Sequence, residues 1–565
     1  MQAPKPRRTD SKKDLPDLLE AQSDEQVVFL KKTPEPVVIG RGPVSGPVAA
    51  TKGGIGYVVG GAQSDFHSPD DRAKKLIQLQ QQGVLVAKTP QEIYDEGVFG
   101  DKKKLAMVFT SGGEGSTIGV NLSTVTQDLG QTHVVLGAWQ GFKAGVKPQD
   151  EFKTDLVVLN DPNTIKRMAE TGGSPLGMSR TKLKPGSPQE DQLFDNVKDL
   201  GMVFGTGGGD HSRNFLALHQ KAEDEGSDLT VAVTPKSMDN DLSIKLKGGE
   251  TKNSLMLGFL TAAHTMRRHW FDEFQSAAGS GRWVVGFFFG RGAGWTVLGA
   301  TRCDAAYRQQ MKKEGILDAD LENKMDALGG KQIALVPEKM VTIPEFVGEV
   351  NRINSQGRDS TGGVAVSEGF MFREMSDEYK RLLKQKENGE LNPNDVMAKA
   401  AEGDLEDLIK DKNLNKVFKA KPDIAKEFFG LVLKPETDVW GNPKMTVMPK
   451  VVDAVVNVLT DVKKTNYTEI KYEARTAKAT PRDEALGRAT GQIQAQMIRQ
   501  GRSGLTTVLC AAGEDPMLID PEKRGATFTP FEEIEAMSEK ENTLQQFSDD
   551  YLRKLGVFTG GCVPS

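Results

Sequence analysis

Glycine, acidic and basic residues are concentrated in two short stretches of the chain, and each stretch follows an apolar run. Residues 208–212 read Gly-Gly-Asp-His-Ser and follow the apolar residues 202–204, and residues 236–241 read Lys-Ser-Met-Asp-Asn-Asp and follow the run 229–233. Glycines let a backbone approach a phosphate closely, a carboxylate binds a divalent metal, and a lysine neutralises phosphate charge. Together the two stretches predict phosphoryl-transfer chemistry.

The two acids of the second stretch have the spacing of residues on one face of a strand. Asp239 and Asp241 are two residues apart, so in an extended backbone their side chains point to the same side and Asn240 points away. One acid would accept a hydroxyl proton while the other positions it or the metal. Two aspartates alone are equally typical of a helix cap or a solvated turn.

These stretches belong to a longer alternation of strand and helix patterns that begins at Leu105. The apolar residues 105–110 lead into a glycine turn at Gly112 and Gly113. Alternation of this kind predicts an α/β fold with mostly parallel sheets, in which phosphate ligands bind at the carboxyl ends of the strands. Residues 373–433 are strongly charged with helical spacing of their apolar positions, and we expect a helical insertion there.

The composition limits the classes of protein to which this chain can belong. The 565 residues predict two or three domains, and the net charge of -5, from 73 basic and 78 acidic residues, gives no reason to expect nucleic acid or a membrane as a partner. Three widely spaced cysteines give no disulfide framework and no metal spacing. The basic N-terminus has no apolar stretch after it, so we expect a cytoplasmic protein.

From about Leu105 to about Gly504 the order of motifs resembles the phosphofructokinase family, in its long, pyrophosphate-dependent type. The matches on the donor side are the glycine turn Gly112 and Gly113, a second glycine segment that ends in Arg180, the metal-binding acid Asp210 after Gly209, and the signature residues Lys236, Ser237, Asp239 and Asp241. The resemblance implies Mg²⁺ on Asp210, Asp239 as the general base, and donor contacts from the glycines, Arg180, His211 and Lys236.

The sugar-phosphate side of the family's site is matched from separate parts of the chain. The resemblance assigns sugar-phosphate contacts to Ser237 and Asp239 as well as to Phe289, Gly290, Arg291, Glu338, Tyr472 and Arg475, and Lys478 and Asp483 continue the long-form pattern. Arg282 has the spacing of an arginine that reaches a neighbouring subunit's site. A homodimer or higher homo-oligomer is therefore implied.

Two positions bear on the phosphoryl donor. ATP-dependent members of the family carry glycine at the two positions where this chain has His211 and Lys236. A lysine there would neutralise a bare pyrophosphate, and a bulky residue after Asp210 would crowd an α-phosphate. Pyrophosphate-dependent relatives usually carry aspartate at the position of His211, so this chain departs from the family pattern there, and a histidine in a glycine turn is equally typical of a tolerated polar residue.

The fold implied by the resemblance is phosphofructokinase-like, with two similar three-layer α/β domains that face a central cleft. We expect the following division: an N-terminal extension at 1–104, a donor domain at 105–262 with about 476–525 returning to it, a sugar-phosphate domain at 263–372 with about 434–475, a helical insertion at 373–433, and a C-terminal helical segment at 526–565.

The implied activity is reversible transfer of a phosphoryl group from pyrophosphate to O1 of fructose 6-phosphate. Two alternatives remain open from the sequence. One is an ATP-dependent phosphofructokinase or a sedoheptulose-7-phosphate kinase, and the other is a non-catalytic regulatory homologue. The sequence argues against a non-catalytic homologue, because such a homologue is expected to have lost at least one of the residues that carry the chemistry. All five are present: Asp210, Lys236, Asp239, Asp241 and Arg475.

Overall fold

The structure is a computed structural model, and it describes residues 27–29, 36–38, 58–59 and 104–557, apart from 131, 153–154, 161, 171, 250, 254, 357–360, 436–444, 471, 510–514, 525, 539–551, 554 and 556. Most of the predicted N-terminal extension therefore lies outside the described residues. Its described parts, β1 (Val27–Phe29), β2 (Pro36–Val38) and β3 (Val58–Val59), form a small antiparallel sheet in the order β2-β1-β3.

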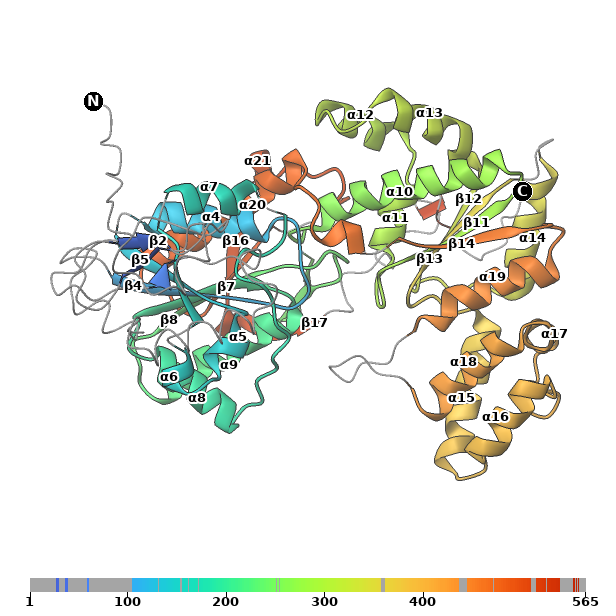
Figure 1. Cartoon of the computed structure of the whole chain (residues 1–565), viewed down its shortest axis with the longest axis horizontal. Helices are drawn as coiled ribbons and strands as arrows, with labels where there is room; N and C mark the ends of the chain where they lie inside the picture. The colour runs from blue at the N-terminus through green and yellow to red at the C-terminus, as the bar shows by residue number, and fades with distance from the viewer. Residues whose placement is uncertain are drawn as a thin grey trace, which may run out of the picture.

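The first half of the molecule is built on a seven-stranded sheet in the order β16-β15-β8-β7-β4-β5-β6 (Figure 1). The five strands from β15 to β5 are parallel, and the two edge strands are antiparallel to their neighbours. The strands are β4 (Lys104–Ser111), β5 (His133–Ala138), β6 (Leu156–Val158), β7 (Met202–Gly207), β8 (Thr230–Pro235), β15 (Leu505–Val508) and β16 (Thr527–Pro530).

Helices cover both faces of this sheet, which explains why β5, β7 and β8 are buried along their whole length. One face packs on α4 (Ile118–Leu129), α7 (Pro162–Glu170) and α20 (Pro481–Arg499), and the other on α5 (Phe142–Gly145), α8 (Pro188–Val197) and α9 (Gly209–Asp224), beside the short α6 (Gln149–Phe152). The predicted α/β class with parallel-dominated sheets is confirmed.

The second half contains a four-stranded parallel sheet in the order β12-β13-β11-β14. Its strands are β11 (Trp283–Phe288), β12 (Gln332–Leu335), β13 (Gly363–Ser367) and β14 (Thr465–Ile470). One face packs on α10 (Phe259–Gly279), α11 (Trp295–Thr301), α12 (Ala305–Lys313) and α13 (Ala319–Leu328), and the other on α14 (Ile343–Ser355) and α19 (Val447–Leu459).

Four helices form a lobe below the second sheet in the view of Figure 1. They are α15 (Arg373–Glu387), α16 (Pro393–Glu402), α17 (Lys412–Ala420) and α18 (Pro422–Leu433), and they fall within the range predicted to be a helical insertion. Their apolar side chains share one core with α14 and α19. Among the described residues, no helix is long and apolar enough to cross a membrane.

The chain after residue 525 differs from the predicted helical segment. Its described residues include β16, the 3-10 helix η6 (Phe531–Glu533) and β17 (Ile534–Ser538). Strand β17 pairs antiparallel with β9 (Ser243–Leu246), which also pairs with β10 (Thr251–Asn253). Pairing with a strand far away in the sequence therefore holds residues 534–538 in an extended conformation.

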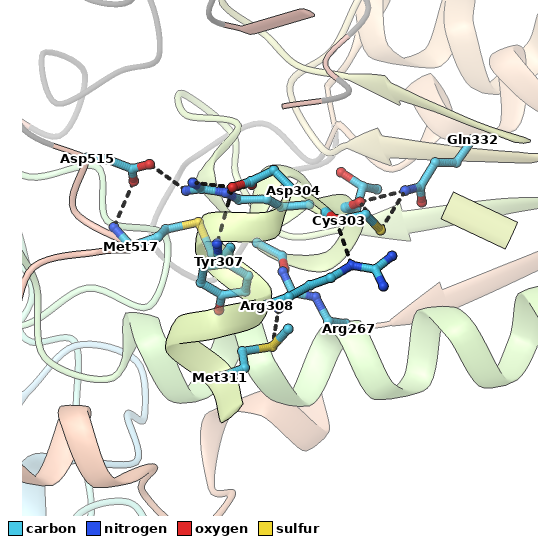
Figure 2. Close-up of polar contacts among 12 residues, drawn as sticks. Arg267, Cys303, Asp304, Tyr307, Arg308, Met311, Gln332, Asp515 and Met517 are labelled. Atoms are coloured by element: carbon cyan, nitrogen blue, oxygen red, sulfur yellow. Dashed lines mark hydrogen bonds and ion pairs between the residues drawn. The ribbon is translucent and has the colours of Figure 1, made fainter. Parts of the chain in front are cut away.

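A buried ion pair ties a late part of the chain to the second half. The Arg302 guanidinium donates to Asp515 Oδ2 at 2.5 Å, and the two side chains are only 2% and 10% exposed (Figure 2). Arg302 also pairs with Asp304, and it lies over the ring of Tyr307 at 5.1 Å. Arg267 lies over the same ring at 4.3 Å. Arg302 bonds to both Asp304 and Asp515 within this cluster, so we assign the cluster a structural role.

Removal of the Asp515 carboxylate should be costly because Arg302 would then be buried with only part of its charge compensated. We expect Asp515→Ala to lower the free energy of unfolding by about 3 kcal/mol, measured on the first transition in urea. The matched control is Asp326→Ala, which removes the 64% exposed partner of Arg308 and should cost less than about 1 kcal/mol. Equal losses in the two variants would show that burial adds nothing to the Arg302 pair.

Candidate functional site

The turn after β4 brings three backbone segments together at the carboxyl end of the first sheet. Gly112 has a φ of 102°, and its N–H donates to the carbonyl of Ser179 at 2.6 Å. A Cβ on Gly112 would lie 3.0 Å from the backbone nitrogen of Gly208. Glycine is needed here both for the positive φ and for this close approach.

Lys236 follows β8 and crosses under this turn. Its side chain runs so close to Gly115 that a Cβ there would lie 2.5 Å from Lys236 Cδ. The ammonium group donates to the carbonyls of Gly113 and Glu114, the second at 3.2 Å. Burial, with repulsion from Arg475, lowers the pKa of Lys236 to about 8, so the group is mostly protonated at neutral pH.

Two arginines reach the same turn from different parts of the chain. A Cβ on Gly113 would lie 3.1 Å from Arg475 Nη1 and 3.5 Å from Arg180 Nη2. Arg475 ends the short helix η5 (Tyr472–Arg475), which follows β14 of the second sheet, whereas Arg180 follows the glycine segment of the first half. The site therefore draws cations from both halves of the molecule.

A cavity of about 310 Å³ opens at this point, lined by residues 112–114, Gln140, residues 177–180 and Arg475. A larger cavity, about 930 Å³, lies at the opposite, amino-terminal ends of the strands, beside Leu105, His133 and Met202. We place the site at the smaller cavity because the glycine turn and the cations converge there. Parallel sheets also bind phosphate ligands at the carboxyl ends of their strands.

Glu114 is an acidic member of the site that the sequence analysis did not single out. Its carboxylate accepts a hydrogen bond from the Ser174 N–H at 2.7 Å. Burial raises the pKa of Glu114, and this hydrogen bond together with Lys236 and Arg475 opposes the rise. The signal in the sequence was an acid directly after the glycine pair.

The acidic stretch after Lys236 is a turn and not the extended strand that its spacing suggested. Strand β8 ends at Pro235, and Asn240 has a φ of 52°. Ser237 Oγ donates to Asp241 Oδ1 at 2.5 Å and accepts from the Asp239 N–H at 3.3 Å. Asp239 lies close enough to Lys236 to raise the pKa of that lysine, against the stronger effect of burial.

Asp210 lies in the first turn of α9, directly after Gly209. Its carboxylate is 26% exposed and pairs with Lys182, at 3.2 Å, and with Arg213. Among the described residues, no group of three or more histidine, cysteine or acidic side chains could hold a metal alone. One accessible carboxylate does fit Mg²⁺ that arrives with phosphate oxygens, since Mg²⁺ is commonly bound by one or two carboxylates plus substrate phosphates.

His211 is in the core and not at the cavity, contrary to its predicted donor contact. The side chain is fully buried, and its ring lies 5.1 Å from the ring of Phe142 and 4.7 Å from that of Phe215. A Cβ on Gly207 would lie 2.5 Å from His211 Cγ, so the ring fills the space beneath β7. Burial lowers the pKa of His211 to about 3, so the ring is neutral.

The predicted sugar-phosphate residues lie at the carboxyl end of β11 and around it. The Arg475 guanidinium lies 4.5 Å from the centre of the Phe289 ring, which joins this group to the cations of the glycine turn. Gly290 has a φ of 119°, and its carbonyl accepts from Ser367. Glu338 accepts from the Gly294 N–H at 2.9 Å.

Of the three remaining predicted residues, Arg282 lies at the other end of the strand. Arg291 is exposed and pairs with Glu368 at 3.2 Å. Arg282 precedes β11, at the end opposite to Phe289, and donates to Asn466 at 3.1 Å. An arginine at that end of the strand is remote from the site of its own chain. Tyr472 begins η5, the helix that carries Arg475.

Glycine turns, a buried lysine and two arginines thus lie together at the ends of parallel strands in an α/β protein, an arrangement that suits a phosphate ligand. Comparison with known families agrees: the model of the phosphofructokinase family matches residues 106–498. This match covers more than half of the 565 residues, so the chain belongs to the phosphofructokinase family. No curated protein sequence matches the chain.

Solved structures with the same fold include two bacterial pyrophosphate-dependent phosphofructokinases. The enzyme from Nitrosospira multiformis matches with a TM-score of 0.52 and 15% identity over 80% of this chain and 90% of that one. The enzyme from Marinobacter aquaeolei matches with a TM-score of 0.50 and 15% identity over 81% of this chain and 92% of that one. At this identity the likeness shows the fold alone.

The contact between Gly115 and Lys236 gives a direct test of the site. Gly115→Ala places a methyl group 2.5 Å from Lys236 Cδ, so the stem must move and the ammonium group should be displaced. We expect binding of inorganic phosphate, measured by calorimetry, to weaken about 10-fold, the effect of losing roughly 1.4 kcal/mol. Gly248→Ala is the matched control, since a Cβ there meets no atom within 4 Å. Unchanged binding in Gly115→Ala would remove Lys236 from the site.

Proposed function

We propose that this protein transfers a phosphoryl group reversibly between pyrophosphate and O1 of fructose 6-phosphate. The observation that carries the proposal is the convergence of Lys236, Arg180 and Arg475 on one glycine turn. Three cations beside a glycine turn suit the charge that develops on a transferring phosphoryl group and its leaving phosphate. Membership of the phosphofructokinase family supports the choice of a sugar phosphate as acceptor.

The donor is argued from the cavity and from Lys236. A volume of about 310 Å³ is at the small end of the range of about 300–1,000 Å³ for ligand sites. Such a space suits a bare diphosphate better than a nucleotide. The expected crowding by His211 gives no support, because that ring faces the core. Lys236, which is only 3% exposed and mostly protonated, remains the feature that favours pyrophosphate.

Mg²⁺ belongs to the proposal as an ion that arrives with the donor. Asp210 would hold it from the protein side, and the ion would supply charge stabilisation on the phosphate oxygens. Lys182 and Arg213, which pair with Asp210 in the absence of a donor, would then be available to phosphate. The accessibility of the Asp210 carboxylate supports both the binding of Mg²⁺ and the release of Lys182 and Arg213 to phosphate.

The acceptor chemistry is assigned to the turn after Lys236. Asp239 would accept the O1 proton, while Ser237 and Asp241, which bond to each other, keep the turn in shape. Arg475 would bind the sugar phosphate from the second half, with Phe289 stacked beneath its guanidinium. Glu338 and Arg291 would contact the sugar, and both lie near the carboxyl end of the second sheet.

The proposal includes a homo-oligomer, and the position of Arg282 supports it. This exposed arginine is at the amino-terminal end of β11, and Phe289 is at the carboxyl end, with six strand residues between them. At about 3.3 Å per residue this separation is roughly 20 Å. Arg282 would therefore serve the site of a neighbouring copy, and an isolated chain would lack part of its site.

The deciding assay measures initial rates with fructose 6-phosphate and Mg²⁺, and detects fructose 1,6-bisphosphate directly with either pyrophosphate or ATP as donor. We expect turnover with pyrophosphate and none with ATP. Turnover with ATP alone would show that Lys236 does not select the donor. A lack of turnover with both donors would favour sedoheptulose 7-phosphate as the acceptor or a regulatory role, and the assay with that sugar separates the two.

The general base has its own test. Asp239→Asn keeps the shape of the side chain but cannot accept the O1 proton, so kcat should fall about 10²–10⁴-fold. Binding of pyrophosphate, measured by calorimetry, should change little. Asp228→Asn, which alters an exposed acid beside the opposite cavity, serves as the control and should keep full activity. A kcat within twofold of the parent would assign the proton transfer to another group.

A further inference from the structure

Asp483 is a fully buried carboxylate that lies away from the cavity and has backbone donors on both oxygens. Oδ1 accepts from the Gly258 N–H at 3.0 Å, and Oδ2 accepts from the Thr261 N–H at 3.1 Å. These two residues begin α10, whose first N–H groups have no partner within the helix. Asp483 itself is in the first turn of α20, so it holds the start of one helix against the start of another.

The backbone that Asp483 holds is anchored at every residue from 255 to 258. The Leu255 N–H donates to the carbonyl of Leu509 at 2.9 Å, and the Met256 N–H donates to Asn240 Oδ1 at 3.0 Å. Leu257 forms a parallel bridge with Lys236. The Asp483 contact to Gly258 is the last of these anchors along the chain.

Residues 255–258 support Lys236 in two ways. The bridge to Leu257 fixes the lysine backbone. Gly258 lies against the turn at Gly115, past which the lysine stem runs. A Cβ on Gly258 would be 3.5 Å from Gly115 Cα, and a Cβ on Gly115 would touch the Lys236 stem. Asp483 therefore reaches Lys236 through Gly258 and Gly115. The contact of Met256 with Asn240 extends the same support to the turn of Asp239.

We propose that Asp483 is the positioning residue that holds the Lys236 ammonium group against the glycine turn, where it would meet the donor phosphate. The inference rests on the proposed function for the identity of that phosphate but not for the contacts. Removing one acceptor from Asp483 should loosen residues 255–258 and release Lys236 toward water. Lys236 would keep its charge and lose its fixed place.

Asp483→Asn is the informative substitution because it preserves the volume of a side chain that is fully buried. The amide NH₂ group must then face either the Gly258 or the Thr261 N–H, so one acceptor is replaced by a donor. Burial raises the pKa of Asp483, and the hydrogen bonds from Gly258 and Thr261 oppose this rise. Thr261→Val is a milder second variant, since the Thr261 hydroxyl accepts from the Thr480 N–H at 3.0 Å.

The test titrates Lys236 directly in the full-length protein. The rate of Lys236 acetylation by acetic anhydride is followed by mass spectrometry as a function of pH, which gives the pKa of that amine without any assay of turnover. The parent should titrate at about 8, with Glu114, Asp239, Arg180 and Arg475 as its charged neighbours. In Asp483→Asn we expect the pKa to rise by about one unit or more toward the ordinary lysine value, as hydration is regained.

A control and a second readout separate positioning from general damage to the fold. Asp155→Asn changes another buried carboxylate of the first half, one that pairs with Lys147, and should leave the Lys236 titration unchanged. Binding of inorganic phosphate should weaken about 10-fold in Asp483→Asn and change little in the control. An unshifted Lys236 pKa in both Asp483→Asn and Thr261→Val would overturn the inference. A shifted pKa in a protein that does not use pyrophosphate would leave it standing and reject only the proposed function.

Discussion

The site depends on keeping one ammonium group charged in a place with almost no water. Lys236 is 3% exposed, and burial opposes its charge, as its lowered pKa records. Two backbone carbonyls of the glycine turn compensate this cost, and they can do so only because Gly115 lets the stem pass. The glycines, the end of β8 and the neighbouring acids are all arranged around this single constraint.

A site of this kind needs like charges close together, and the two halves of the molecule make that possible. Arg475 lowers the pKa of Lys236, so the closeness of the two cations is unfavourable on its own. Glu114 and Asp239 offset part of this repulsion, and stacking on Phe289 orients the arginine. On the proposed function, the remaining excess of positive charge is what a multiply charged phosphate would neutralise on binding.

The sequence predicted the strands, their parallel arrangement and the glycine turn, because apolar runs that end in glycine or proline are local signals. It did not predict the direction of the His211 side chain. Asp210 and His211 are consecutive in α9, where successive side chains point about 100° apart, so one faces solvent and the other the core. The positive φ of Asn240 and the pairing of β17 were also missed, since both depend on partners far away in the sequence.

Within the described residues, two of the places where the chain crosses between its halves meet each other. The outward crossing runs through residues 255–258 into α10, and the return crossing follows Arg475 into α20. Asp483 joins the two at Gly258, and Thr480 joins them again at Thr261. Residues 255–258 also hold the backbone of Lys236 through Leu257, and Arg475 lies shortly before α20 in the chain. Two of the three cations of the site are therefore carried by, or paired with, the segments that link the halves, so a change in the arrangement of the domains would also change the site.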